Sequence, residues 1–157
     1  MLHRLIAQGE HQQQDFKYEI SDARKIARTL SAFANTDGGR LLIGVKDNGK
    51  IAGVRSDEEI YMVEAAATRY CVPPVECHMS IHRVEGHNVV IAEVSPAEHR
   101  PVRAQLDDGK LCAFVRIADE NIVATPVQML AQFIRFGLVE QQFAGHTFVY
   151  VARGEGE

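Results

Sequence analysis

One stretch, SAFANTDGGRLLIGVKDNGKIAGV at residues 31–54, constrains the fold more than any other part of the sequence. Two adjacent glycines separate a helix-like run from an apolar one, and glycine readily adopts the left-handed conformation that often follows a helix. The apolar residues 41–45 predict a buried strand. The sequence DNG at residues 47–49 is typical of a tight hairpin. We therefore expect residues 50–54 to return antiparallel beside that strand.

Helical patterns lie on both sides of this stretch. Ser21 is a suitable N-cap, and the apolar residues after it follow the i, i+3, i+4 spacing of a helix with one buried face. Ser56 opens an S-x-x-E capping box, which predicts the start of a second helix. Thr125 opens a T-x-x-Q box with proline at the first helical position, which predicts a third. Residues 1–19 are expected to contain a short helix and then a strand.

The second half of the chain is richer in strand signals. Residues 76–84 and 88–94 predict a second hairpin, and residues 111–117 predict a further strong strand. The order of elements indicates an α+β fold, with a mixed, mainly antiparallel sheet and helices packed against one of its faces. We expect one domain over residues 1–137. The tail at 138–157 ends in an alternating strand pattern, 146–152, which could pair with a partner chain.

Length and composition set the class of protein. The chain has 157 residues, 46% of them hydrophobic, which suits one well-packed domain. It contains no apolar run of the roughly 18 residues that a membrane span needs, and the N-terminus lacks a signal-peptide core, so we expect a cytoplasmic protein without a membrane partner. Its three cysteines form no CxxC pair, which favours reduced thiols used for packing.

Charge is distributed unevenly along the chain. The formal net charge of −4 argues against a nucleic-acid binder, but residues 20–55 hold seven basic residues against three acidic ones, whereas residues 56–99 hold two against eight. A polyanion would therefore contact the first of these segments. The candidate phosphate ligands are Arg24, Lys25, Arg28, Arg40, Lys46 and Lys50. The alternative interpretation of these six cations is an ordinary solvated face.

Four blocks of sequence, in this order, resemble the Schlafen-type AlbA-like domain family of DNA-binding modules. They are Glu10 with Asp15, Phe16 and Lys17; residues 32–54; residues 99–102; and residues 114–117 followed by Asn121 and Ala124. The resemblance implies an Alba-like fold and a nucleic-acid-binding domain of a bacterial regulator-like protein, with low sequence specificity. It also implies a homodimer, since such domains pair, and further domains in the full-length protein.

The resemblance implies a second possible activity. Some Schlafens are endoribonucleases that depend on Mg²⁺ or Mn²⁺ held by three carboxylates. Glu10 and Asp15 match the first two acidic positions, Asp47 is the candidate for the third, and Lys17 could assist. Asp15 departs from the family, which commonly has Glu there, and the shorter side chain would disturb the metal geometry. The alternative is that the three acids have only local structural roles.

Three other functions are weighed. The loop Asn35, Thr36, Asp37, Gly38 and Gly39 could cradle the phosphate of ATP, but it precedes a strand and lacks the G-x-x-x-x-G-K-[ST] run, so a structural turn is favoured. A zinc site would need ligands such as Cys71, Cys77, His78, His82 and His87, whose spacing fits no usual pattern. A protein-interaction domain without nucleic acid stays open.

Overall fold

The computed structural model describes residues 1–55, 57–127, 139–144 and 147–152. The chain forms two compact units, Met1–Val123 and Ala124–Glu157. In the part of the chain that is described, no helix has the length and apolar character needed to cross a membrane.

The first unit contains three helices and eight strands among its described residues. In chain order they are α1 (Leu2–Ala7), β1 (Gln14–Lys17), α2 (Ala23–Ala34), β2 (Gly39–Ile43), α3 (Asp57–Arg69), β3 (Cys71–Val72), β4 (Cys77–Val84), β5 (His87–Val94), β6 (Arg103–Gln105), β7 (Leu111–Ile117) and β8 (Glu120–Val123). One sheet has the order β1-β2-β5-β4 and the other β3-β6-β7-β8. β1 and β2 are parallel, and the other pairs are antiparallel. The predicted α+β class with a mixed, mainly antiparallel arrangement is confirmed.

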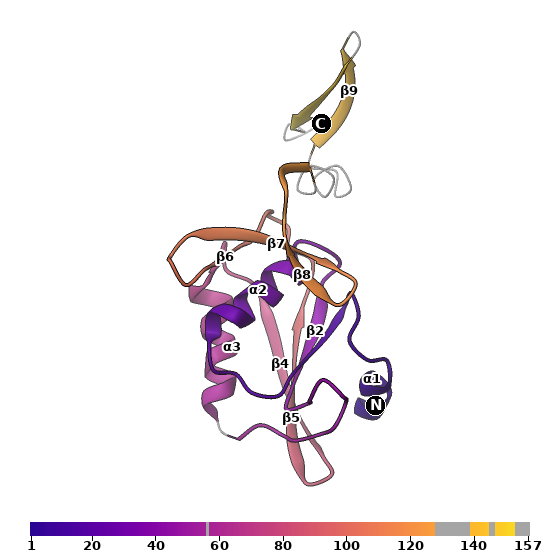
Figure 1. Cartoon of the computed structure of the whole chain (residues 1–157), viewed down its shortest axis with the longest axis vertical. Coiled ribbons are helices and arrows are strands. Elements are labelled where there is room, and N and C mark those ends of the chain that lie inside the picture. Colours follow the sequence, from indigo (N-terminus) through magenta and orange to yellow (C-terminus); the bar gives the residue numbers. More distant parts are fainter. Residues whose placement is uncertain (56, 128–138, 145–146, 153–157) are drawn as a thin grey trace. The chain divides into compact units, whose positions relative to one another are not determined.

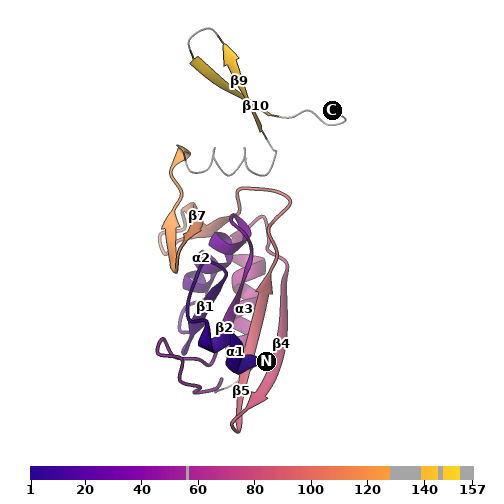
Figure 2. The same cartoon turned by 90° about the vertical axis from the view of Figure 1, so that its right-hand side faces the viewer.

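Helix α2 lies between the two sheets, with β7 on one side and β4 and β5 on the other (Figures 1 and 2). The side chains of β2 alternate accordingly. Leu41 and Ile43 join the core cluster that contains α2, whereas Leu42 joins a second cluster with Phe16 and with Leu2 of α1. The expectation that helices cover one face is therefore wrong for α1, which packs on the opposite face of the β1-β2-β5-β4 sheet.

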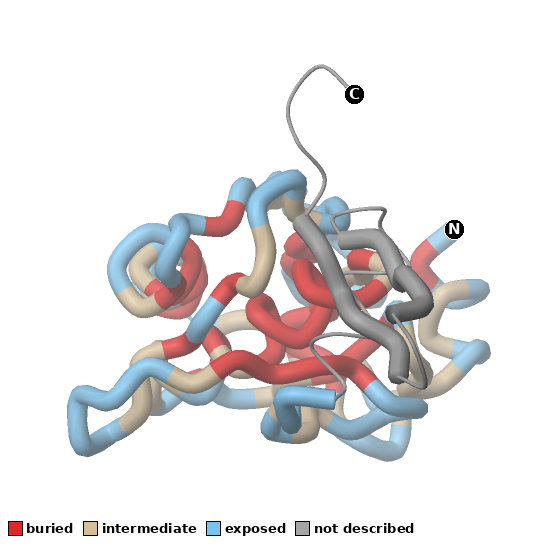
Figure 3. The backbone as a smooth tube through the Cα atoms, turned by 90° about the horizontal axis from the view of Figure 1, so that it is seen from above, coloured by how far each residue is buried: buried red, intermediate tan, exposed pale blue. Residues whose placement is uncertain are grey.

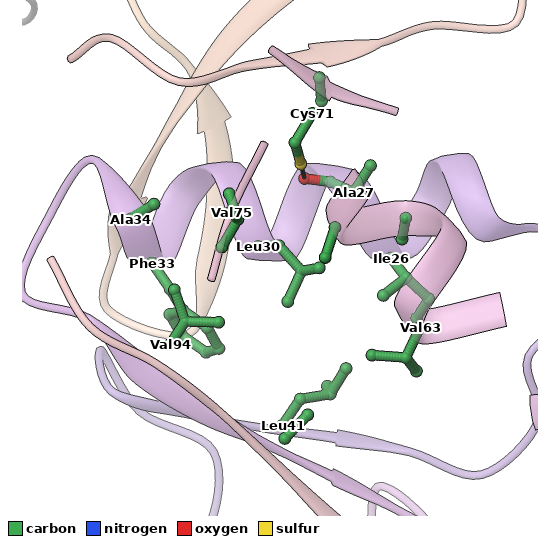
Figure 4. Close-up of a cluster of buried hydrophobic side chains, with 14 of the residues drawn as sticks. Ile26, Ala27, Leu30, Phe33, Ala34, Leu41, Val63, Cys71, Val75 and Val94 are labelled. Atoms are coloured by element: carbon green, nitrogen blue, oxygen red, sulfur yellow. Dashed lines mark hydrogen bonds between the residues drawn. The ribbon is translucent and has the colours of Figure 1, made fainter. Parts of the chain in front are cut away.

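Because α2 is covered on two sides, its C-terminal two thirds is almost fully buried (Figure 3). Figure 4 shows Leu30 and Phe33 of this helix pointing toward Leu41 and Val94 of the first sheet. On the other side, the Cys71 thiol donates to the Ala27 carbonyl at 3.6 Å. Each large apolar side chain buried in this way contributes on the order of 1.5–3 kcal/mol of transfer free energy.

Two local predictions are wrong. The N-cap of α2 is Asp22, whose Oδ1 accepts from the Arg24 amide at 2.9 Å, and not Ser21. Residues 50–54 do not return as a strand beside β2. Ile51 forms an isolated bridge with Val45, and the Ala52 and Gly53 amides donate to the Gly44 carbonyl. The reason is that β2 is a central strand whose two edges are already taken by β1 and β5.

Other predictions are confirmed. The short helix and strand near the N-terminus are α1 and β1, the second hairpin is β4–β5, and the strong strand is β7. The tail contains the strand β10 (Thr147–Ala152), which pairs antiparallel with β9 (Val139–Ala144) of the same chain, and its pairing with a partner chain stays a prediction. Ser56, of the predicted capping box, and Gln128, of the third helix start, lie outside the described residues.

Candidate nucleic-acid interface

An open depression of about 530 Å³ lies where β1, α2 and β8 meet. We call it the basic groove. It is lined by Lys17, Lys25, Arg28, Thr29, Phe114, Glu120, Asn121 and Ile122. Lys25 and Arg28 are three residues apart, so they share one face of the helix, and Lys17 ends the neighbouring strand. The groove therefore gathers three cations from two elements against one carboxylate.

The side chain of Arg28 contains a buried hydrogen-bond donor. Its Nε is buried, and among the residues that the structure describes it has no hydrogen-bond acceptor. Lys25 is exposed, and the side chain of Lys17 is 36% exposed. A buried N–H without an acceptor costs about 1–3 kcal/mol, so Arg28 Nε carries a local cost to stability.

The polar wall of the groove is fixed by hydrogen bonds within the protein. The Asn121 Nδ2 donates to Thr29 Oγ1 at 2.9 Å, and its Oδ1 accepts from Arg116 Nη1 at 2.8 Å. Both ends of this amide are engaged. It therefore shapes the groove and has little capacity left to read the edge of a base.

A pair of carboxyl groups lies beside Lys17. Glu10 is hydrogen-bonded to Asp15, and its Oε1 accepts from the Phe16 amide at 3.1 Å. Burial, together with the hydrogen bond to Asp15, raises the pKa of Glu10 to about 7. Asp15 is itself buried between two cations, with Lys17 Nζ at 3.7 Å and Arg116 Nη2 at 3.8 Å. Glu10 is therefore partly protonated at neutral pH.

Arg116 organises this region, and the sequence reasoning gave it no role of its own. Its buried guanidinium donates to the carbonyls of His11 at 3.1 Å and Gln14 at 3.0 Å, and it lies 5.0 Å from the centre of the Phe33 ring. In the sequence, the signal for this role is Arg116 itself, a single charged residue inside the otherwise apolar run CAFVRI. Such a charge is buried only where it is paired, and here it links β7 to Gln14 of β1 and to His11 before that strand.

Residues 10–125 match the sequence model of a family described as Schlafen, AlbA_2. The chain belongs to this family. A search of curated proteins found no match.

Two solved structures resemble this Schlafen AlbA_2 chain in fold. One is the crystal structure of the DIP2311 protein from Corynebacterium diphtheriae, with 21% identity, a TM-score of 0.64, and 85% of this chain covered. The chain spans only 26% of that protein. The other is a solution structure of the N-terminal domain of an ATP-dependent DNA helicase RecG-related protein from Nitrosomonas europaea, with 22% identity and a TM-score of 0.55. The match covers 80% of this chain and 92% of that domain.

The three carboxylates that the Schlafen resemblance suggested do not gather. Glu10 and Asp15 are together, but Asp47 is exposed in the turn after β2. Among the described residues, no group of three or more His, Cys, Asp or Glu side chains is arranged to hold a metal ion. Asp15 is also paired with two cations, so the arrangement that the structure describes does not form a three-carboxylate metal centre. The same finding applies to the histidines and cysteines considered for zinc.

The six predicted phosphate ligands differ in their surroundings. Only Lys25 and Arg28 line the basic groove, and Lys50 is exposed in the turn after β2. Arg24 lies 3.4 Å from Asp22 and 3.6 Å from Asp107. Arg40 donates to Gln14 at 2.7 Å and to Gln8 at 2.8 Å, and Lys46 lies over the Tyr18 ring at 4.7 Å.

The loop Asn35–Gly39 of this Schlafen AlbA_2 domain is occupied by contacts within the chain. The buried Asn35 donates to the carbonyls of Val102 and Phe114, both at 2.8 Å, and accepts from the Val102 amide at 2.7 Å. Thr36 Oγ1 accepts from the Arg116 amide at 2.9 Å, and Asp37 accepts from the side chains of Gln12 and Gln13.

The two glycines of this loop are needed for close packing. A Cβ on Gly38, whose φ is +74°, would lie 2.6 Å from the Val94 carbonyl oxygen, and a Cβ on Gly39 would lie 2.6 Å from the Phe33 ring. Both glycines therefore serve the approach of this chain's own atoms. The geometry supports a structural turn more than a cradle for the phosphate of ATP.

Proposed function

We propose that this Schlafen AlbA_2 domain binds nucleic acid, DNA or RNA, by its phosphates, in the basic groove. The observation that carries the proposal is the convergence of Lys17, Lys25 and Arg28 on one open depression. Phosphate contacts supply most of the non-specific affinity of nucleic-acid-binding proteins. Membership of the family and the fold shared with a domain of a RecG-related protein support the same assignment.

The proposal includes low sequence specificity. The groove offers cationic donors, while the neighbouring Asn121 amide is engaged at both ends. Contacts of this kind position a strand without reading its bases. We also propose that the protein works in the cytoplasm as a homodimer and as part of a larger regulator-like protein. Light scattering at several protein concentrations would test the dimer, and a monomer at all of them would refute it.

The test of binding uses fluorescence anisotropy with labelled single- and double-stranded oligonucleotides over a salt series. We expect the logarithm of the binding constant to fall with the logarithm of salt concentration, with a slope of roughly 0.7–0.9 for each phosphate contacted. Lys25→Ala should lower affinity and reduce that slope by about one contact.

The matched control is Lys110→Ala, which removes the same charge from a side chain that is 82% exposed in the β6–β7 turn. It should leave affinity and slope unchanged. Equal effects of the two substitutions would remove the groove from the interface. Absence of binding even at low salt would overturn the proposal and favour a protein-interaction domain.

Metal-dependent endoribonuclease activity is the second candidate function. The Glu10–Asp15 pair beside Lys17 supports it, because a carboxyl group with a pKa near 7 can exchange a proton at neutral pH. The exposed position of Asp47 weighs against it. The test is incubation of structured RNA with Mn²⁺. If the candidate is right, RNA is cleaved and Asp15→Asn abolishes the cleavage, whereas the exposed control Asp108→Ala does not.

The same assay decides the role of Asp47. Cleavage that persists in Asp47→Ala would remove Asp47 from the mechanism, and cleavage that is lost there would restore it as the third acid. Absence of cleavage by the unsubstituted protein, with binding intact, would leave a binding domain only.

A further inference from the structure

Strand β4 lies at an edge of the β1-β2-β5-β4 sheet, and among the described strands it pairs with β5 alone (Figure 2). The hairpin turn Glu85–Gly86 has positive φ at both residues, which is the type I′ geometry, so Val84 and His87 exchange hydrogen bonds across it. The alternation along the strand then turns the peptide groups of Met79 and Ile81 away from β5. Apart from its ladder to β5, the backbone of β4 makes no hydrogen bond with the described residues.

The other sheet edges of the first unit are shorter, and one of them is occupied. β1 has four residues. Its Gln14 carbonyl accepts from Arg116, and its Phe16 amide donates to Glu10. β3 has two residues and β8 has four. β4 has eight, and its residues 77–82 include no proline and no Asp, Glu, Lys or Arg, which are residues that protect an edge from pairing. β4 is therefore the edge best able to accept a further strand.

The second unit contains a strand of suitable length. β9 and β10 have six residues each and form a sheet of two strands among the described residues. An isolated hairpin of this kind is marginally stable in water and needs a third strand or a packed face. β10 reads TFVYVA, without a charge, whereas β9 reads VEQQFA. Because uncharged apolar strands at an open edge are templates for pairing, we expect the third strand beside β10.

A pocket of about 420 Å³ opens between α3 and β4. Its lining includes Tyr61 and Ala65 of the helix and Met79 of the strand, and Tyr61 is 60% exposed. A strand added to β4 would continue the sheet, so the side chains on one of its faces would lie beside this pocket. Phe148 and Tyr150 are two residues apart in β10 and therefore share a face. Their aromatic groups suit the apolar part of the lining.

We propose that β10 of a second copy of this chain adds to the free edge of β4 and extends the β1-β2-β5-β4 sheet. Each copy has one such edge and one such hairpin, so two contacts form reciprocally in a symmetric dimer. Main-chain hydrogen bonds supply the affinity of strand addition, and the pocket beside β4 selects the side chains. The inference rests on the homodimer of the proposed function and adds to it the surface by which the two copies meet.

The experiment measures the dimer by size-exclusion chromatography with light scattering over a range of protein concentrations. Ile81→Lys places a charge on the edge of β4, where the side chain is 60% exposed, and Tyr150→Lys places one in β10. Each should raise the dissociation constant of the dimer by about a hundredfold or more, since an unpaired charge enters both contacts. The matched control Ile117→Lys, at a side chain that is 48% exposed at the end of β7, should leave the constant unchanged.

A mixture of the two variants separates edge pairing from a general loss of stability. Ile81→Lys keeps an intact β10, and Tyr150→Lys keeps an intact β4. A mixed dimer therefore has one intact contact, whereas a dimer of either variant alone has none. Mixing should restore a dimer of intermediate affinity. If either variant fails to fold, as judged by its melting temperature, a synthetic peptide of residues 139–152 replaces the mixture, and an excess of it must dissociate the unsubstituted dimer.

Each outcome decides the inference. Loss of the dimer in both variants with recovery on mixing supports it, and so does dissociation by the peptide where the peptide replaces the mixture. A dimer that persists in both variants overturns the inference and leaves a homodimer that meets by another surface. No recovery on mixing, or no effect of the peptide, also overturns it. A monomer at all concentrations overturns the homodimer and the inference together, and leaves nucleic-acid binding in the basic groove to be judged by its own assay.

Discussion

Substituting Asn35 by alanine tests how the loop before β2 is held. The side chain makes three short hydrogen bonds, two to the Val102 peptide groups and one to the Phe114 carbonyl, at 2.7–2.8 Å in a buried position. Each bond contributes about 1 kcal/mol, and a buried group left unpaired costs about 1–3 kcal/mol. Ser31 still donates to the Val102 carbonyl, so the Val102 amide and the Phe114 carbonyl bear most of the loss.

These terms add to a destabilisation of about 3–5 kcal/mol, a large part of the 5–15 kcal/mol that typically holds a domain folded. Urea titration followed by circular dichroism measures it, and the melting temperature should fall by about 10 °C. Asn48→Ala is the matched control, because Asn48 makes one hydrogen bond, to the Lys50 amide, in an exposed turn. It should cost below about 1 kcal/mol. If both variants unfold at the same urea concentration, the bridging role of Asn35 is refuted.

Three further predictions concern stability and reactivity. Because the folded pKa of Glu10, about 7, exceeds the ordinary value of 4.5 for a glutamate, the free energy of unfolding should fall by about 1–2 kcal/mol, after solvent screening, as pH rises from about 4.5 to 7. Glu10→Gln should abolish this fall, and an unchanged pH profile would refute the assignment. Gly38→Ala should lower the free energy of unfolding by about 2 kcal/mol more than Gly109→Ala does. Both glycines have positive φ, but of the two only a Cβ on Gly38 would meet another atom at close range. Equal free energies of unfolding for the two variants would contradict the clash. Burial raises the pKa of the Cys71 thiol to about 12. Alkylation of Cys71, measured by mass spectrometry, should therefore be about a hundredfold slower in the native chain than in the unfolded chain. Equal rates would refute the burial of this thiol.

The sequence predicted most of the regular elements because their signals are local. The i, i+3, i+4 pattern found α2, and the run 41–45 found β2 apart from its ends. It failed for the return strand after the DNG turn, because the choice of partner for β2 depends on β1 and β5, which lie far away in the chain. It also placed the N-cap at Ser21 when the neighbouring Asp22 caps the helix, and local patterns seldom separate two adjacent cap residues.

For the candidate site, the sequence alone identified the kinds of residue and the family, because the motif residues are recognisable without their positions in space. Only the tertiary structure decided which of them meet. It brought Glu10, Asp15 and Lys17 together and placed Asp47 in an exposed turn. It also selected Lys25 and Arg28 for the groove and turned Arg24 and Arg40 toward other partners. Convergence depends on the packing of α2 between two sheets, and that packing is set by long-range burial, which no local pattern encodes.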